Sequence, residues 1–230
     1  MKCWAGMVER GLIVSCQALP DEPLHSPFIM GRMALAAQQA GAVGIRANSV
    51  PDILEIRNQV KLPVIGLIKK TVPDTRAYIT PTLREVEELV RIGVDIIALD
   101  ATEAQEETYL AQVRQRYPRQ AFMADVSTER EGLRADALGF DYVGPTMAGY
   151  TEQSRGVDRL QLLDALLAGC SRARVLAEGG YDTPEQAAGA IARGAWAVVV
   201  GSAITRPQVI AGRFARQVKE ALRRHNATEE

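Results

Sequence analysis

The stretch Val175–Gly180, which reads VLAEGG, decides the fold of this chain. Three apolar residues lead directly into a carboxylate and two glycines, as in a fully buried parallel strand whose carboxyl end presents polar groups. Ala197–Ser202 (AVVVGS) repeats the pattern, and Val64–Ile68 ends similarly in Lys69 and Lys70. Because α/β barrels keep their chemistry at the carboxyl ends of the strands, these runs predict an enzyme.

Short apolar runs alternate with longer amphipathic segments along the whole chain. The segment Pro81–Gly93 has apolar residues at helical spacing and a glycine at the expected helix end, and comparable segments end at Gly41, Gly139 and Gly194. In Asp182–Glu185 a capping residue precedes a proline and an acid, which marks a helix start. The predicted strands are Leu12–Val14, Val43–Ile45, Val64–Ile68, Ile96–Leu99, Ala121–Ala124, Tyr142–Val143, Val175–Ala177 and Val198–Val200.

This series of strand–helix units predicts an α/β fold, a closed (β/α)₈ barrel that forms a single domain over residues 1–230. A chain of 230 residues is near the compact end of the range for that fold. A doubly wound open sheet is the alternative. Two longer loops, Ala18–Phe28 and Lys70–Thr80, are expected to overhang the active-site face, which lies at the carboxyl ends of the strands.

Composition narrows the class of protein. The formal net charge is −1 with no long basic run, which argues against nucleic acid as a partner. No apolar run approaches the ~18 residues of a membrane span, and Met1–Arg10 lacks a secretory pattern, so we expect a soluble cytoplasmic protein without a membrane partner. The 3 Cys residues, at positions 3, 16 and 170, form no close pair and there are only 2 His, so neither a disulfide framework nor a metal site is expected. Acid–base chemistry must then come mostly from Lys, Asp and Glu.

Two residues at predicted strand ends are the main catalytic candidates. Lys69 follows an apolar run, and burial near Arg46 or Lys70 would lower its pKa toward that of a usable base. Alternation along the strand does not decide whether Lys69 or Lys70 points inward. Glu178 is either a catalytic carboxylate or the cap of the next helix, and the two glycines that follow it favour catalysis, because they let the backbone approach a ligand closely.

Other strand ends supply supporting candidates. Asp125 belongs either to an ion pair with Arg46 or to the entry of the helix that begins near Ser127 and Thr128. Asp100 is the weakest acidic candidate, since it can simply accept backbone N–H groups of its own loop. Two further candidates are Gln17, at the end of the first predicted strand, and Thr146, at the end of the sixth.

Two glycine-containing loops follow the last two predicted strands, at Gly179–Gly180 and Gly201–Ser202. In barrels of this kind, the corresponding loops hold a phosphate group through their backbone N–H groups. Arg206, just before the helix-starting Pro207, adds a guanidinium suited to phosphate, although an exposed cation near a turn would have the same sequence. Together these residues predict a phosphate ligand.

Six motifs occur in order and at barrel spacing: Gly44–Ser49, Ile68–Lys69, Tyr78–Thr82, Met123–Asp125, Ala177–Gly179 and Ala203–Pro207. Because of these motifs, the chain resembles the N-acetylmannosamine-6-phosphate 2-epimerase family, and the resemblance extends from about Gly11 to the last helix. Two positions depart from the family pattern. Pro145 precedes Thr146 where another small polar residue is usual, and Ser202 stands where a second glycine is common.

The resemblance implies a reaction that interconverts N-acetylmannosamine 6-phosphate and N-acetylglucosamine 6-phosphate, in sialic acid catabolism, without an organic cofactor or metal. The C2 proton lies α to the aldehyde of the open-chain sugar, so a base can remove it if donors stabilise the resulting enolate. By resemblance, Lys69 moves this proton and Glu178 assists at the sugar oxygens or on the opposite face. A homodimer is a further expectation from the family. The supporting positions implied in the same way are Gln17, Arg46, Asp125 and, at the phosphate, Arg206.

Other functions remain open on the residues alone. A barrel lysine beside a carboxylate can also form an imine with a carbonyl, as in a Schiff-base aldolase, and another phosphosugar isomerase would use similar groups. A non-catalytic phosphosugar-binding barrel is disfavoured, because binding phosphate does not need both Lys69 and Glu178. The division of proton transfer between these two residues is also open, and a single base with rotation of the substrate is compatible with the sequence.

Overall fold

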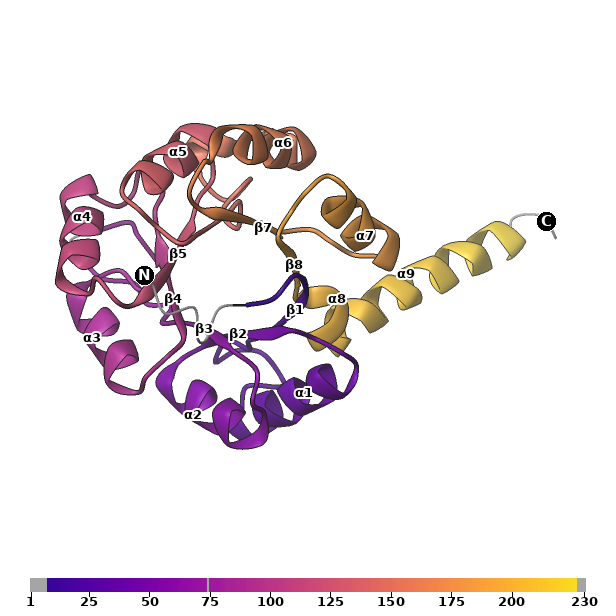
Figure 1. Cartoon of the computed structure of the whole chain (residues 1–230). Helices are drawn as coiled ribbons and strands as arrows, with labels where there is room; N and C mark the ends of the chain where they lie inside the picture. The colour runs from indigo at the N-terminus through magenta and orange to yellow at the C-terminus, as the bar shows by residue number, and fades with distance from the viewer. Residues whose placement is uncertain (1–7, 74, 227–230) are drawn as a thin grey trace.

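The structure is a computed structural model that describes residues 8–73 and 75–226, so Cys3 and most of Met1–Arg10 lie outside the described residues. Its parallel strands form a closed barrel in chain order, with β1 paired to both β2 and β8, and helices surround it (Figure 1). The predicted (β/α)₈ barrel is confirmed and the open sheet is excluded. The strands are β1 (Gly11–Cys16), β2 (Gly44–Asn48), β3 (Val64–Leu67), β4 (Ile96–Asp100), β5 (Ala121–Asp125), β6 (Tyr142–Gly144), β7 (Arg174–Glu178) and β8 (Ala197–Val200).

Strand β3 ends one residue earlier than predicted, because the following chain pairs with a returning loop instead of continuing the barrel sheet. The Ile68 N–H donates to Thr80 Oγ1 at 3.2 Å, and the Thr80 N–H donates to the Ile68 carbonyl at 2.7 Å. An antiparallel bridge between Lys69 and Ile79 extends this pairing. The second of the two predicted long loops therefore folds back against the carboxyl end of β3.

Helix boundaries follow the local sequence signals. At the predicted start of α7, Thr183 is the N-cap, its hydroxyl accepts the Gln186 N–H, and Pro184 is the first helical residue. A positive φ two residues past a helix end occurs at each predicted stop, namely Gly41, Gly93, Gly139 and Gly194. The helices are α1 (Pro27–Gln39), α2 (Val50–Gln59), α3 (Leu83–Arg91), α4 (Glu107–Arg116), α5 (Glu129–Ala137), η1 (Glu152–Ser154), α6 (Arg159–Gly169), α7 (Pro184–Ala192), α8 (Ser202–Thr205) and α9 (Pro207–Asn226). Among these helices, none combines the length and the apolar character needed to span a bilayer.

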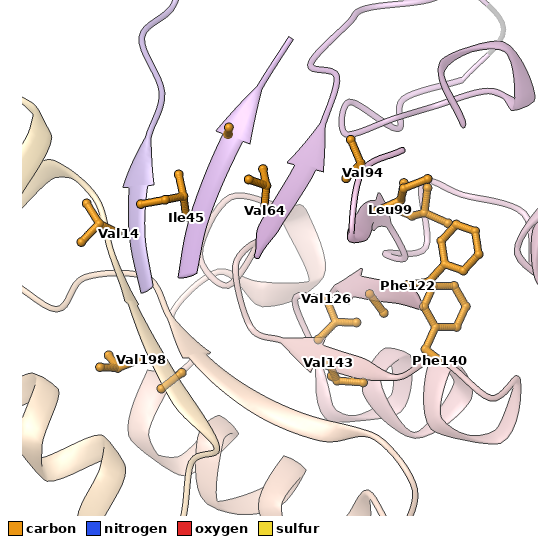
Figure 2. Packing of buried hydrophobic residues seen from close by; sticks show 14 of the residues in the cluster. Val14, Ile45, Val64, Val94, Leu99, Phe122, Val126, Phe140, Val143 and Val198 are labelled. Atoms are coloured by element: carbon orange, nitrogen blue, oxygen red, sulfur yellow. The ribbon is translucent and has the colours of Figure 1, made fainter. Parts of the chain in front are cut away.

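Apolar side chains pack in two layers. Inside the barrel, Ile65, Met123 and Leu176 belong to one buried cluster, so the barrel is a packed core and not a pore. The second cluster joins the strands to the helices, and Figure 2 shows Phe122 of β5 beside Phe140, with ring centroids 6.2 Å apart. Burying such side chains contributes about 1.5–3 kcal/mol each. A ligand can therefore reach polar groups only at the ends of the barrel.

The helices after β8 depart from the regular pattern. Helix α8 is a single turn, and α9 has no buried residue and leads away from the barrel in Figure 1. Phe214 and Val218 on α9 are 71% and 59% exposed, so they do not cover the barrel. Beside α7, the outer face of β1 and β8 forms an apolar groove of about 400 Å³, which Leu12, Ala187 and Val198 help to line.

Candidate active site

A cavity of about 600 Å³ lies at the carboxyl ends of the strands, within the usual size range of small-molecule sites. Its lining includes almost every predicted site residue, although these residues are far apart in the sequence. Asp125 is the exception, because it is fully buried and does not line the cavity. The predicted residues that line the cavity are Gln17, Arg46, Lys69, Thr146, Glu178, Gly179, Gly180, Gly201, Ser202 and Arg206.

Arg46 of β2 is the centre of the buried charge network and is 1% exposed. Its Nη2 donates to Asp125 Oδ2 at 2.6 Å, and its Nη1 donates to a carboxylate oxygen of Glu178. Thr146 Oγ1 donates to the other Asp125 oxygen at 2.6 Å. Burial lowers the pKa of Arg46, but the charges of Asp125 and Glu178 outweigh it and raise that pKa overall. Asp125 thus belongs to an ion pair rather than to a helix entry.

Lys69 lines the cavity while its neighbour Lys70 points away from it. The Lys69 N–H donates to Asn48 Oδ1 at 2.8 Å, which ties the residue to the end of β2. Lys70 Nζ instead donates to Glu85 Oε1 at 2.9 Å, on α3. Burial lowers the pKa of Lys69, and the positive charges of Arg46 and Arg206 lower it further. This is the environment of a lysine that can act as a base.

Glu178 ends β7 and faces the cavity with 12% of its side chain exposed. It does not cap α7, because Thr183 does so. Burial raises the pKa of Glu178 and the Asp125 charge raises it further, against the opposing effect of Arg46. Asp100, by contrast, accepts the Tyr78 N–H at 2.9 Å and the N–H and hydroxyl of its own loop residue 102, so it serves a structural role, as expected of the weakest acidic candidate.

Gln17 has a polar atom available for a ligand. Its side chain is 8% exposed, and its Nε2 donates to Ser15 Oγ at 2.9 Å. Its Oε1 is buried and has no hydrogen-bond partner among residues 8–73 and 75–226. Because an unsatisfied buried amide oxygen is costly, a hydroxyl or N–H group of a bound ligand would stabilise this arrangement.

The glycine loops after β7 and β8 both line the cavity. Gly179 and Gly180 have φ values of 101° and 74°, which only glycine adopts readily, and they line the cavity together with Gly201 and Ser202. Arg206 Nη2 donates to Glu22 Oε2 at 2.9 Å. Glu22 comes from the first predicted long loop, which therefore reaches the mouth of the cavity as expected.

Several lining residues were not predicted from the sequence. Arg159 begins α6, Arg213 lies on α9, and Tyr78, Tyr150 and Tyr181 come from loops. None of them follows a strand directly, so a search confined to strand ends misses them. In the described part of the chain, no group of three or more His, Cys, Asp and Glu side chains is arranged to hold a metal ion.

Comparison with known proteins places the chain in a family. A model of the family described as "Putative N-acetylmannosamine-6-phosphate epimerase" matches residues 30–220. The chain belongs to the N-acetylmannosamine-6-phosphate epimerase family. Two curated members named "Putative N-acetylmannosamine-6-phosphate 2-epimerase" are similar over most of their length. The protein of Enterobacter sp. (strain 638) is 50% identical over 95% of this chain and 97% of its own. That of Caldanaerobacter subterraneus subsp. tengcongensis is 49% identical over 93% of each.

A solved structure of the same epimerase family agrees with the fold. The N-acetylmannosamine-6-phosphate 2-epimerase from Clostridium perfringens superposes with a TM-score of 0.86 and 46% sequence identity. The match covers 91% of this chain and 93% of that one. The family resemblance seen in the sequence motifs is therefore confirmed over nearly the whole barrel.

Proposed function

We propose that this protein interconverts N-acetylmannosamine 6-phosphate and N-acetylglucosamine 6-phosphate by removing and returning the proton on C2. The observation that carries the proposal is one cavity that brings Lys69 and Glu178 together with two glycine loops and Arg206. Epimerisation at C2 needs a base near that carbon, and a phosphosugar needs an anion site at the far end of the molecule. The cavity at the carboxyl ends of the strands holds candidate groups for both requirements, which supports the proposal.

Lys69 is the proposed base. A lysine removes a proton only as the neutral amine, and the lowered pKa of Lys69 increases the neutral fraction near pH 7. The aldehyde of the open-chain sugar acidifies the C2 proton, and the enolate oxygen that develops would be stabilised by positioned donors. No organic cofactor or metal takes part in the proposed step, because the amine and the substrate's own carbonyl supply its chemistry.

Glu178 is the proposed second catalytic group and Arg46 its positioning residue. The Arg46 guanidinium holds the Glu178 carboxylate on one side and Asp125 on the other, so three elements fix the direction of one carboxylate. Glu178 can then act at the sugar oxygens or exchange a proton on the opposite face of C2. We assign Gln17 and Thr146 to substrate binding, because both line the cavity.

The phosphate site is proposed at the two glycine loops. Gly179, Gly180, Gly201 and Ser202 line the same cavity as Arg206. Glycine loops leave backbone N–H groups accessible to an anion, and a guanidinium can donate two parallel hydrogen bonds to phosphate. This division puts the reacting carbon near Lys69 and the phosphate near Arg206.

The experiment that tests the function is incubation with N-acetylmannosamine 6-phosphate in deuterated water, followed at C2 by NMR. We expect the gluco epimer with deuterium at C2, and a rate loss of about 10²–10⁴-fold in Lys69→Ala and in Glu178→Ala. Persistent exchange without epimerisation in Glu178→Ala would assign Glu178 to the opposite face. Substrate binding by the wild type with neither exchange nor epimer would refute the epimerase and favour a phosphosugar-binding protein.

Borohydride reduction separates the epimerase from a Schiff-base aldolase. Both enzymes would use a lysine of lowered pKa, but only the aldolase forms an imine that borohydride converts to a stable amine. We expect the intact mass of the wild-type protein to stay unchanged after reduction with substrate present. A substrate adduct that is missing in Lys69→Ala would favour the aldolase.

We also propose that two copies of the chain associate, each laying its α9 in the groove between α7 and β1 of the other. In this barrel the helix after β8 should cover that strand, yet α9 has no buried residue and the groove is apolar. Ile210, Phe214, Val218 and Leu222 recur every four residues and form one apolar stripe on α9. In such a pair, the apolar stripe on α9 of each copy would pack into the apolar groove of the other copy.

The cellular setting that fits this function is sialic acid breakdown in the cytoplasm. The family resemblance supports the pathway, and a reducing compartment agrees with the free thiols of Cys16 and Cys170. Isotope tracing of labelled sialic acid in a strain lacking the gene would test it, with N-acetylmannosamine 6-phosphate expected to accumulate.

A further inference from the structure

Three arginines besides Arg46 line the cavity, and their pairing differs. Arg206 is held by Glu22 at 2.9 Å, and Arg213 Nη2 lies 2.7 Å from Asp182 Oδ1. Arg159 lines the same cavity, but within residues 8–73 and 75–226 no ion pair or hydrogen bond engages its guanidinium. Two of these cations are thus partly neutralised by carboxylates, whereas Arg159 retains its full charge at the mouth of the site.

The position of Arg159 is defined by the loop proposed to bind phosphate. A Cβ atom built on Gly180 would collide with Nη1 of Arg159, so the guanidinium fills the space that a side chain at position 180 would occupy. Its Nη2 also lies 3.8 Å from the position of a Cβ on Gly149, in the loop after β6. Gly180 therefore provides room for Arg159 as well as a backbone turn with φ of 74°.

The direction of Arg159 follows from the start of α6. Asp158 caps this helix by accepting the Leu160 and Gln161 N–H groups, which fixes the first turn. Arg159 is the first helical residue, and its side chain extends from the helix to the glycine loop after β7. Arg159 therefore extends from a helix outside the barrel into a site whose other residues lie mostly at the ends of the strands.

We propose that Arg159 is a further substrate-binding residue, which donates hydrogen bonds to the phosphate group of the substrate and sets the preference for phosphorylated over unphosphorylated sugars. The inference rests on the proposed phosphosugar substrate and extends its binding site to α6. An unpaired guanidinium can donate two parallel hydrogen bonds to phosphate, and no existing ion pair with a carboxylate has to break when phosphate binds. Arg206 would have to share its donors with Glu22.

The test compares Arg159→Ala and Arg159→Lys with the matched control Arg155→Ala. Arg155 lies nearby, is exposed and pairs with Glu152, but it does not line the cavity. For Arg159→Ala we expect KM for N-acetylmannosamine 6-phosphate to rise about tenfold or more, with kcat changed less than about threefold. The KM of Arg159→Lys should lie between those of the wild type and Arg159→Ala, because lysine keeps the positive charge but cannot donate the two parallel hydrogen bonds of a guanidinium. Arg155→Ala should match the wild type.

Direct binding of inorganic phosphate, measured by titration calorimetry, tests the inference without turnover. We expect its Kd to rise about tenfold in Arg159→Ala, while the weak binding of unphosphorylated N-acetylmannosamine stays unchanged. An unchanged phosphate Kd, or an equal rise in Arg155→Ala, would overturn the assignment. If the wild type binds phosphate through Arg159 but produces no epimer, the proposed reaction fails and the phosphate contact stands. If Arg159→Ala epimerises with an unchanged KM, the reaction stands and the phosphate contact is refuted.

Discussion

Lys69 can remove a proton only after losing its own, so the pH dependence of the reaction reports its surroundings. Burial lowers its pKa first, followed by the charges of Arg46 and Arg206. The neutral fraction increases as pH rises through this pKa, so the rising limb of kcat/KM should lie below the ordinary lysine value of about 10.4. Arg206→Gln removes one of the two cations, and we expect the limb to move to higher pH.

The pH–rate profile of kcat/KM, measured with wild type and Arg206→Gln, checks this expectation. Arg213→Gln is the control, because that arginine lies at the same cavity but is not among the groups that shift the Lys69 pKa. Its limb should stay at the wild-type position even if substrate affinity falls. A limb that stays in place, or moves down, in Arg206→Gln would argue against Lys69 as the base.

Asp125 illustrates a residue whose importance is electrostatic although it does not reach the cavity. It is fully buried and shares the Arg46 guanidinium with Glu178. Asp125→Asn keeps the shape but removes one of two counter-charges to a buried cation. We expect the free energy of unfolding to fall by about 2 kcal/mol, less than the roughly 3–5 kcal/mol for an ion left with no partner, because Glu178 remains.

Urea unfolding measures the fall in the free energy of unfolding of Asp125→Asn. The control is Glu88→Gln, which likewise converts a carboxylate to an amide, but in an ion pair exposed to solvent. Arg84 and Glu88 lie 3.3 Å apart at the surface of α3, where solvent screens them, so about 0.5 kcal/mol or less is expected. Equal effects in the two variants would mean that the Arg46 network contributes no more than a surface pair.

Strand β3 and helix α7 show how the same substitution has opposite effects in different elements. A Cβ on Gly66 of β3 would lie 2.8 Å from Val94 Cγ1, in the turn before β4, and 2.9 Å from Ile53 Cδ1 on α2, so Gly66→Ala forces these side chains away from the strand. We expect a loss of about 1–3 kcal/mol by urea unfolding. Gly189 of α7 has open space around its Cβ position, so Gly189→Ala should raise the free energy of unfolding by about 0.5–1 kcal/mol. A stable Gly66→Ala would show that this packing can relax.

Prediction from sequence succeeds at the scale of elements because the signals there are local. Most strands contain a short apolar run that is buried on both faces, and a helix start such as Thr183 is encoded within four residues. The inward direction of Lys69 was not encoded locally. It depends on a loop that folds back onto β3 and on Glu85 of α3, which binds Lys70 instead. Asp125 was likewise ambiguous until its partner from β2 was known.

At the scale of the whole molecule, barrel closure assembles the site. Pairing of β1 with β8 brings the end of the first strand beside the Gly201 loop, and the Glu22–Arg206 ion pair joins the same two regions. Convergence of the strand ends was predictable, because it follows from closure alone. The reach of Arg159 from α6 to Gly180 was not predictable, since it depends on a contact between elements that carry no sequence motif. No sequence motif indicated that α9 leaves the barrel either.

The departure of α9 leads to a prediction about assembly. If its apolar stripe fills the groove of a second copy, a charge on the stripe should separate the copies, because a carboxylate cannot be buried there without a partner. Phe214→Glu should elute as a monomer in size-exclusion chromatography with light scattering, while the wild type elutes as a dimer. Arg216→Glu, on the opposite side of the same helix, changes the charge more and should remain dimeric. A monomeric wild type would mean that the groove and the stripe stay exposed in each chain, whereas a dimer that survives Phe214→Glu would place the contact on another face.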